Sequence, residues 1–406
     1  MASDGSTQTS HSDAPAVVSE EPLELPRRRR FDSVAEAERL ARRALPHAMY
    51  DRLSHGSDES LTLANNLQAF REVSFRPRGA AVDPTRSTQT TVLGEPIVAP
   101  ILLGPIGALR LQHPSGGVGA IEAAARFGTI CVLSPAAGHP IQELVPRNGS
   151  PLWTQITTGM GGRDGVEKQL AEAARLGYRA AVVTIDSGVP PKAAAIRLDP
   201  ATIAQFAPDL IRHPRWTYRF VRDGMRLNVA NAALGVNKSP AAANAAPSSS
   251  TPRPVEWDDV RWVAEQWKGP VVVKGILTAE DARRAVDLGA AAVIVSNHGG
   301  MALDGARATL ESLPEVVSAV GGQVEVLVDG GIRTGQDVAK ALALGARAVL
   351  LGRAYVMGLA VGGAAGAERV LHLIRNDLWR TLGFLGCGSV DDLGPQHVSA
   401  PQSWSA

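Results

Sequence analysis

The sequence predicts a (β/α)8 barrel, in which eight parallel strands close into a ring and a helix follows each strand. Two observations carry this prediction. Short, continuously apolar segments recur along the chain, which is typical of parallel strands that are buried on both faces. Ala-rich helical patterns separate most of these segments, as the crossover connections between parallel strands require. The expected strands are residues 101–104, 129–133, 152–156, 180–185, 271–274, 292–296, 324–328 and 348–351, and the clearest helical patterns are residues 119–127, 165–176, 279–288, 306–320 and 336–345.

The composition agrees with one large α/β domain. With 406 residues and 45% hydrophobic content, the chain can bury a large core, and one barrel with extensions accounts for the length better than several small domains. The net charge of +1 gives no reason to expect nucleic acid as a partner. Two cysteines, Cys131 and Cys387, favour a reducing compartment without a disulfide framework. Long apolar runs and a signal-type core are both absent, so we expect a cytoplasmic protein with no membrane partner. We also expect no metal site.

The chain divides into a barrel and flanking segments. Residues 1–30 are polar and end in four arginines, so we expect a disordered tail whose charge cluster is solvated rather than docked on an anionic partner. Residues 31–95 are expected to form a helical segment that leads into the barrel of residues 96–395, and residues 396–406 a C-terminal tail. The irregular insertion at 187–255 follows the fourth strand, and a long loop in that place is a lid or a disordered segment.

Polar side chains gather where four consecutive strands end. The sixth strand delivers Ser296, His298 and two glycines, and similar endings precede it. In barrel enzymes the carboxyl ends of the strands form the active-site face, so we expect all of these side chains at one mouth. They supply hydrogen-bond donors for the edge of a heteroaromatic ring and a cation that can stabilise negative charge on that ring. They also supply a histidine that can pair with a carboxylate for proton transfer. The other members of the set are Gln155, Thr184, Asp186 and Lys274.

The last two strands end in turns suited to a phosphate group. One turn contains Asp329, Gly330, Gly331 and Arg333, and the other contains Gly352 and Arg353. Glycine backbone N–H groups beside an arginine at a helix N-terminus hold a phosphate dianion well. Barrels frequently build that subsite from the loops after strands seven and eight. The sequence therefore predicts a phosphate subsite here.

These endings carry a family resemblance. The segments 274–275, 296–300, 303–304, 329–333 and 351–353, with Leu45, Pro46, Tyr50, 62–65 and 75–77, resemble the FMN-dependent 2-hydroxy acid oxidase and dehydrogenase family from about residue 35 to 395. The resemblance implies bound FMN and a homotetramer. It implies that His298 and Asp186 form the catalytic pair and that Lys274 acts with them at the flavin N1 and C2 carbonyl. It places the remaining FMN contacts at Pro105, Ile106, Gly107, Ser134, Gln155, Thr184, Ser296, Asp329, Gly330, Gly331, Arg333, Gly352 and Arg353.

The departures from the family concern the substrate. Where the family has a carboxylate-binding arginine after His-Gly-Gly, this chain has Met301, and residues 187–193 contain no counterpart of the second arginine. Two tyrosines near the flavin are replaced by Arg52 and Thr157. Because the bidentate arginine contact is strong and specific, its loss argues against lactate, glycolate or mandelate. Arg52 and Lys192 are the candidates to replace the missing arginines electrostatically, but neither has the position that the family arrangement has.

The branch of the family that takes part in mycofactocin maturation also lacks that arginine, and segments 212–216, 257–262 and 297–305 resemble it more than they resemble glycolate oxidase. The expectation is an FMN enzyme that oxidises a carbon bearing an amine or an alcohol on an uncharged, non-carboxylate substrate. We expect a small molecule or peptide-derived compound, such as a secondary metabolite, that is larger than the short hydroxy acids. Three alternatives stay open. They are a 2-hydroxy acid oxidase or dehydrogenase with a rearranged carboxylate site, an FMN isomerase, and a non-catalytic flavin-bound partner in a biosynthetic complex.

Overall fold

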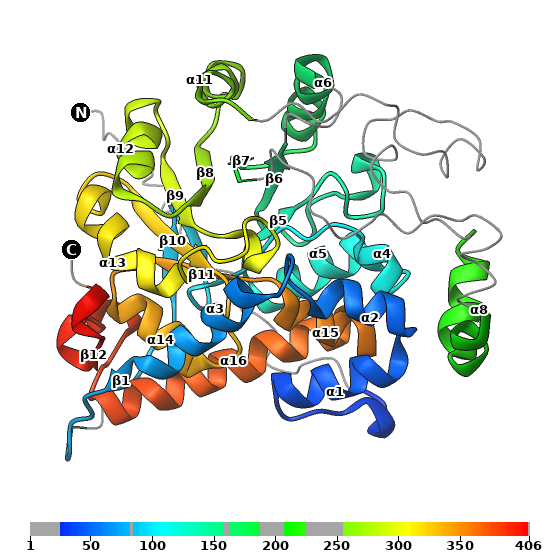
Figure 1. Cartoon of the computed structure of the whole chain (residues 1–406), viewed down its shortest axis with the longest axis horizontal. Helices are drawn as coiled ribbons and strands as arrows, with labels where there is room; N and C mark the ends of the chain where they lie inside the picture. The colour runs from blue at the N-terminus through cyan, green and yellow to red at the C-terminus, as the bar shows by residue number, and fades with distance from the viewer. Residues whose placement is uncertain (1–24, 82–83, 158–161, 187–206, 225–254, 405–406) are drawn as a thin grey trace, which may run out of the picture.

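A computed structural model shows a closed barrel of eight parallel strands, which confirms the fold expected from the sequence (Figure 1). It describes residues 25–81, 84–157, 162–186, 207–224 and 255–404. All eight expected strands are present, and their ends differ from expectation by at most two residues. In ring order the strands are β4 (Ile101–Leu103), β5 (Cys131–Leu133), β6 (Leu152–Ile156), β7 (Ala180–Thr184), β8 (Val271–Ile276), β9 (Ala292–Val295), β10 (Glu325–Asp329) and β11 (Ala348–Leu351), which pairs with β4.

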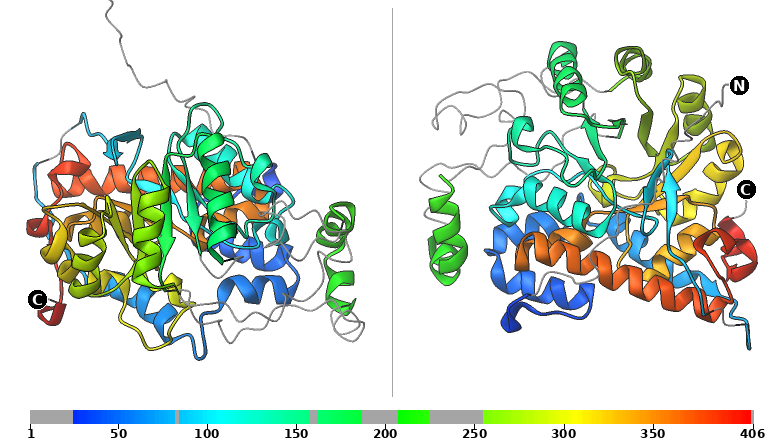
Figure 2. Two further views of the ribbon diagram at one scale, coloured as in Figure 1. Left: turned by 90° about the horizontal axis from the view of Figure 1, so that it is seen from above. Right: turned by 180° about the vertical axis from the view of Figure 1, so that it is seen from behind.

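Helices surround the ring, as the two further views show (Figure 2). They are α5 (Gly116–Phe127), α6 (Gly162–Arg175), α11 (Trp257–Gln266), α12 (Ala279–Asp287), α13 (Thr309–Val320), α14 (Gly335–Ala343), α15 (Arg353–Gly362) and α16 (Ala364–Leu385). Helices α12 and α14 each begin at a threonine side-chain cap. Thr334 caps α14 by accepting a hydrogen bond from the Asp337 backbone, and the Asp337 side chain bonds back to the cap residue.

Side chains that point into the ring form a core separate from the one beneath the helices. Leu102, Trp153, Val182 and Ile294 belong to this inner cluster, and all four are buried. A hairpin of β2 (Thr90–Val92) and β3 (Glu95–Ile97) adds Val92 and Ile97 to it. The Leu93 backbone donates a hydrogen bond to Glu325, the first residue of β10. The hairpin therefore closes the amino-terminal end of the barrel and leaves the opposite end for a site.

The N-terminal segment packs onto the barrel. Helix α1 (Val34–Ala44) lies on α15, and α3 (Leu61–Glu72) lies on the turn that follows β9. Helix α2 (His47–Ser54) and the short helix α4 (Leu109–Gln112) lie nearby (Figure 1). The expected helical lead-in is therefore present in the structure.

The inner ends of both expected tails are packed, which corrects the boundaries at residues 30 and 396. Leu25 is buried in the main core, and Arg27–Arg29 form a 3-10 turn. At the other end, β12 (Val398–Ser399) pairs with β1 (Ser74–Phe75), and Trp404 is buried. Single apolar residues without periodicity gave no signal of this packing. Residues 1–24 of the expected tail lie outside the described residues.

Part of the insertion at 187–255 forms a helix that the sequence did not predict. Helix α8 (Pro214–Arg222) begins with proline at its first position, and the Trp216 indole donates a hydrogen bond to the Leu111 carbonyl of α4 at 2.9 Å. The low-complexity part of the insertion falls outside the described residues. Within the described part of the chain, no helix is both long enough and apolar enough to span a membrane.

Candidate functional site

The polar side chains expected at one mouth are brought together there. Gln155, Thr184, Lys274 and Ser296 are buried at the carboxyl ends of β6, β7, β8 and β9. The Gln155 amide donates to Thr184 Oγ1 at 2.9 Å, and Lys274 Nζ donates to Ser296 Oγ at 2.8 Å. Thr184 and Lys274 are direct partners in the strand register. The four side chains therefore line one continuous arc at the open end of the barrel.

A backbone irregularity in β8 lets Asp186 pack closely against this strand. The register of β8 against β9 shifts between Lys274 and Ile276, and Gly275 between them has φ of 107°. A Cβ atom at this glycine would lie 2.9 Å from Asp186 Cβ, so only glycine fits. Bulges of this kind redirect side chains next to active sites. Here the bulge makes room for Asp186.

Lys274 is a buried cation held between carboxylates. Its Nζ atom lies 3.3 Å from Asp329 Oδ2, and its side chain is almost fully buried. Burial opposes its charge, but the neighbouring carboxylates of Asp329 and Asp186 outweigh burial and raise the pKa of Lys274. The site thus keeps a full positive charge at its floor, where a ligand carrying developing negative charge is stabilised.

His298 and Asp186 form the expected pair. His298 Nδ1 lies 2.9 Å from Asp186 Oδ1, and the side chains are 35% and 12% exposed. Burial opposes ionisation of Asp186, but Lys274 and the hydrogen bond from His298 outweigh it and lower the pKa of this carboxyl group. An ionised Asp186 fixes the proton on Nδ1 and leaves Nε2 of the ring as the acceptor. The arrangement can take a proton from a ligand at the mouth.

The His298 turn is held by two asparagines that sequence reasoning missed. His298 has φ of 59°, in the left-handed region, which only a constraining environment maintains. The amides of Asn66 and Asn297 exchange two hydrogen bonds of 2.8 Å, and Asn297 Oδ1 also accepts from the Gly300 backbone at 3.1 Å. Both asparagines are buried. No sequence signal pairs side chains 231 positions apart.

The two phosphate turns lie side by side at the ends of β10 and β11. Gly331 has φ of 86°, and a Cβ there would lie 2.3 Å from the Asn66 carbonyl oxygen. Burial, and after it the nearby charge of Arg333, lowers the pKa of Arg353 to about 10. Two neighbouring cations without a bound anion repel each other, and a phosphate dianion removes that cost.

Arg353 has a second role that was not expected. Three of its N–H groups donate to the carbonyls of Leu53, His55 and Gly299, at 2.7, 2.8 and 2.6 Å. A guanidinium has five N–H donors, so two stay free for an anion. These bonds tie α2 and the His298 turn to the N-terminus of α15. Arg353, the first residue of α15, therefore holds parts of the site that are far apart in sequence.

The structure fits FMN at this end of the barrel. Asp329 Oδ1 is buried without a hydrogen-bond partner among the described residues, so it can accept from a ligand hydroxyl. The loop of Pro105, Ile106 and Gly107 lies between the β5 loop and the second phosphate turn. Here Ala108 donates to the Ala136 carbonyl, and Ile106 lies within 3.5 Å of a Cβ built on Gly352. Ser134, beside Ala136, accepts a hydrogen bond from its backbone at 3.1 Å.

The residues expected to face the substrate are only partly connected to this arc. The Met301 backbone donates to the His298 carbonyl at 3.2 Å, so Met301 closes the same turn. Thr157 Oγ1 is buried after β6 with no partner among the described residues. Arg52 is an exposed residue of α2. Lys192 falls outside the described residues, and within them no group of three or more His, Cys, Asp or Glu could hold a metal ion.

An eight-stranded barrel with adjoining phosphate turns and a buried lysine is the framework of enzymes that bind a mononucleotide cofactor. The FMN-dependent dehydrogenase family matches residues 41–400 of this chain. Pre-mycofactocin synthase of Mycobacterium tuberculosis is 39% identical over 383 residues, which cover 91% of this chain and 95% of that protein. The peroxisomal (S)-2-hydroxyacid oxidase GLO4 of Arabidopsis thaliana is 36% identical over 366 residues, which cover 90% and 96%.

Among solved structures, the monotopic membrane protein (S)-mandelate dehydrogenase matches with a TM-score of 0.84 and 34% identity. The match covers 91% of this chain and 100% of that one. The chain belongs to the FMN-dependent dehydrogenase family. It is an FMN-dependent oxidoreductase, as the phosphate turns and the family resemblance predicted.

Proposed function

We propose that this enzyme oxidises a carbon that bears an amine or an alcohol, on a small or peptide-derived substrate that carries no carboxylate at the reacting centre. The observation that carries the proposal is Met301, which closes the His298 turn where the family resemblance has a carboxylate-binding arginine. An unpaired carboxylate buried beside methionine would cost several kcal/mol, so an uncharged group is favoured there. The similarity to pre-mycofactocin synthase supports the same substrate class.

The proposed chemistry uses the His298 and Asp186 pair. Because Asp186 holds the proton on Nδ1 of His298, Nε2 accepts the proton from the substrate nitrogen or oxygen. The carboxylate of Asp186 then stabilises the imidazolium that forms. When bound, FMN supplies the acceptor for the hydride that leaves the substrate carbon. Lys274 keeps its charge at the floor of the site and stabilises negative charge on the ring system held there.

We propose the same FMN contacts that the resemblance implies. Arg333 and Arg353 would hold the phosphate with the N–H groups of Gly330, Gly331 and Gly352, and Asp329 would accept from the ribityl chain. Gln155, Thr184, Ser296 and Ser134 would bond the edge of the ring. The shared mouth and the unpartnered oxygen of Asp329 support this assignment.

A 2-hydroxy acid oxidase or dehydrogenase is the second candidate function. It is supported by the similarity to the hydroxyacid oxidase and by Arg52, whose neighbour Leu53 is bonded to Arg353 at the edge of the His298 turn. A cation on α2 could then bind a carboxylate from a direction that differs from the family arrangement. The two candidates differ in what the substrate carries, so they are separable by experiment.

The test is anaerobic reduction of the bound FMN by a panel of amines, lactams and short hydroxy acids, in wild type, Met301→Arg and His298→Ala. We expect negligible reduction of the wild type by lactate, glycolate or mandelate at millimolar concentration. Met301→Arg should add weak reduction by these acids and impair an amine or lactam substrate. His298→Ala should keep FMN but lose about 10²- to 10⁴-fold in reduction rate. Fast wild-type reduction by a short hydroxy acid would replace the first candidate with the second.

We also propose that the enzyme acts in the cytoplasm as a homotetramer, without nucleic acid or membrane as partner. Its two cysteines are free and buried, which supports a reducing compartment. Light scattering of the FMN-loaded protein tests the oligomeric state. A monomer at micromolar concentration would contradict the tetramer.

A further inference from the structure

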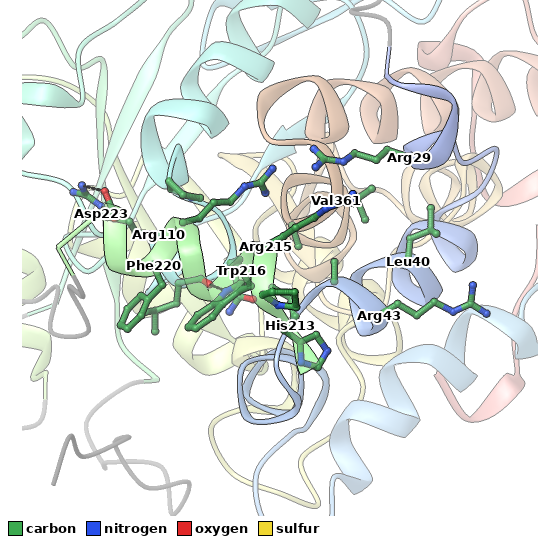
Figure 3. Close-up of a pocket in the computed structure, with 18 of the residues that line it drawn as sticks. Arg29, Leu40, Arg43, Arg110, His213, Arg215, Trp216, Phe220, Asp223 and Val361 are labelled. Atoms are coloured by element: carbon green, nitrogen blue, oxygen red, sulfur yellow. Dashed lines mark hydrogen bonds and ion pairs between the residues drawn. The ribbon is translucent and has the colours of Figure 1, made fainter. Parts of the chain in front are cut away.

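A concave pocket lies on the outside of the barrel, where α8 meets α1, α4 and the end of α15 (Figure 3). Its volume is about 420 Å³. None of the residues expected to hold FMN lines it, and neither do His298, Met301, Arg52 or Thr157. The pocket is thus a separate feature of the molecule. Its size is within the range of roughly 300 to 1,000 Å³ that is typical of small-molecule sites.

The lining is strongly cationic. Asp223 is the acidic residue of the lining, and Arg110 neutralises it through two hydrogen bonds. The remaining arginines form no ion pair with any carboxylate of the described chain. They come from three separate parts of the sequence, and Figure 3 shows Arg29 and Arg43 across the pocket from Arg215. These unpaired arginines are Arg29, Arg43, Arg212, Arg215 and Arg219.

The cationic cluster is more than a solvated surface patch. Arg219 is half-buried, and burial together with the charges of Arg29 and Arg215 lowers its pKa. Like charges that the fold holds together in this way repel each other, so the ligand-free pocket is electrostatically unfavourable. A bound anion reverses the sign of that interaction.

The floor of the pocket offers an unsatisfied polar group. Gln112 is 5% exposed, and its Oε1 atom is buried with no hydrogen-bond partner in the described part of the chain. A buried amide without a partner is costly and rare in native proteins. Beside it, the rings of Trp216 and Phe220 stack with centroids 4.8 Å apart and form an apolar wall. A ligand with an anionic end and a hydroxyl or amino donor satisfies both features.

The wall that α8 contributes is fixed in place. Trp216 bonds the Leu111 carbonyl, Asp223 bonds Arg110, and the Asp209 carboxylate accepts from the His47 backbone at the start of α2. These three attachments come from both ends and the middle of residues 207–224. The pocket is therefore formed before a ligand arrives, which lowers the cost of binding.

We propose that this pocket binds a soluble small molecule with two or more phosphate charges, in the manner of a diphosphate ester. Five unpaired guanidinium groups exceed what a single carboxylate requires, and the planar guanidinium matches phosphate oxygens in pairs. A phosphate of a flat lipid surface would meet the exposed arginines but would not reach Gln112 at the floor. The buried amide thus favours a ligand that enters the pocket.

The test uses the FMN-loaded full chain, titrated calorimetrically with pyrophosphate and with ADP. The informative change is Arg219→Gln, and Arg222→Gln is its matched control, because Arg222 lies on the same helix, is exposed and does not line the pocket. We expect Arg219→Gln to weaken binding about tenfold or more, and Arg222→Gln to change it by less than about twofold. Gln112→Leu should weaken the binding of ADP more than the binding of pyrophosphate, because pyrophosphate has no hydroxyl or amino donor for Gln112 Oε1.

Bound FMN shows that each variant is folded, and Arg215→Gln replaces Arg219→Gln if the latter does not fold. Flavin reduction should be unchanged in both arginine variants, because neither residue belongs to the barrel mouth. Absence of binding at millimolar pyrophosphate and ADP would overturn the proposal. So would equal weakening by Arg219→Gln and Arg222→Gln, since that would be a general charge effect. Binding to vesicles with anionic lipid but to neither soluble probe would assign the cluster to a lipid surface instead.

Discussion

Replacing Asp186 by asparagine tests whether the carboxylate acts through His298. The change removes one charge and keeps the volume of the side chain. Asp186 lies 2.9 Å from His298 Nδ1, so the wild-type pair has a charge-assisted hydrogen bond, and the imidazolium that forms during the reaction is stabilised by it. Asparagine can present either its oxygen or its NH₂ group to Nδ1, and the second choice turns the ring to the wrong tautomer. We expect FMN reduction by the true substrate to slow about 10²- to 10⁴-fold.

The fold should tolerate this change. Asp186 Oδ2 has no hydrogen-bond partner among the described residues, so the buried charge is only partly compensated. Lys274 keeps Asp329 at 3.3 Å as its counter-charge. The loss of unfolding free energy should thus stay near 1–3 kcal/mol, the usual cost of a lost hydrogen bond to a charged group. A rate loss of 10³-fold is about 4 kcal/mol of barrier, so the effect on rate should exceed the effect on stability.

The assay is anaerobic stopped-flow reduction, with FMN content and thermal unfolding measured on the same samples. Asp258→Asn is the matched control, because it also removes one carboxylate charge, at a position on α11 where the side chain is 73% exposed. The control should reduce FMN at the wild-type rate. If Asp186→Asn with full FMN content reacts within about threefold of wild type, the proposed role of the carboxylate is refuted.

Three further predictions concern the cofactor, the asparagine pair and pH. Purified wild-type protein should be yellow with non-covalent FMN, and colourless protein that FMN cannot reconstitute would exclude the proposed site. Arg333→Ala should weaken FMN binding about 10- to 100-fold in a dialysis assay. Asn66→Ala should lower the free energy of unfolding by about 1–3 kcal/mol and slow FMN reduction, because Asn297 loses its partner and no longer holds the His298 turn. An unchanged rate of FMN reduction would show that the asparagine pair is only structural. Because the pKa of Asp186 is lowered in the folded protein, its stabilising contribution is present above the ordinary value near 3.9 and is lost as pH falls through the folded pKa. The difference in melting temperature between wild type and Asp186→Asn should therefore shrink below about pH 4, and a difference that grows in acid would contradict the lowered pKa.

The barrel and its mouth could be predicted because their signals are local. A parallel strand buried on both faces is a short apolar run, and the residue that follows it sits on the active-site face whatever the loops do. Lys274, Ser296 and His298 needed only this rule to be placed together. Gly275 shows its limit, since the bulge that redirects the chain beside Asp186 depends on contacts across two strands.

The parts that were missed depend on contacts between distant segments. Asn66 lies in the N-terminal segment and pairs with Asn297, and Arg353 donates to carbonyls about 300 positions away. Backbone carbonyls carry no sequence signal, so the bonding of Arg353 to α2 could not be read from residue types. Helix α8 was missed for a related reason, because a nine-residue helix inside a long irregular insertion is too short to be stable alone and is stabilised by docking on α4.

The residues at the strand ends and the residues on the segments attached to the barrel have different roles, the first in the chemistry and the second in substrate specificity. The groups that would hold FMN and move the proton stand on strand ends, where the rigid barrel fixes their positions. Two residues expected to face the substrate, Met301 and Arg52, stand on the His298 turn and on α2, and Arg353 attaches both of these segments to the barrel. Changes in the attached segments can alter the substrate while the strand ends stay as they are. Met301 and Arg52 both belong to these segments, so the substrate class of this enzyme should be decided there and not in the barrel core.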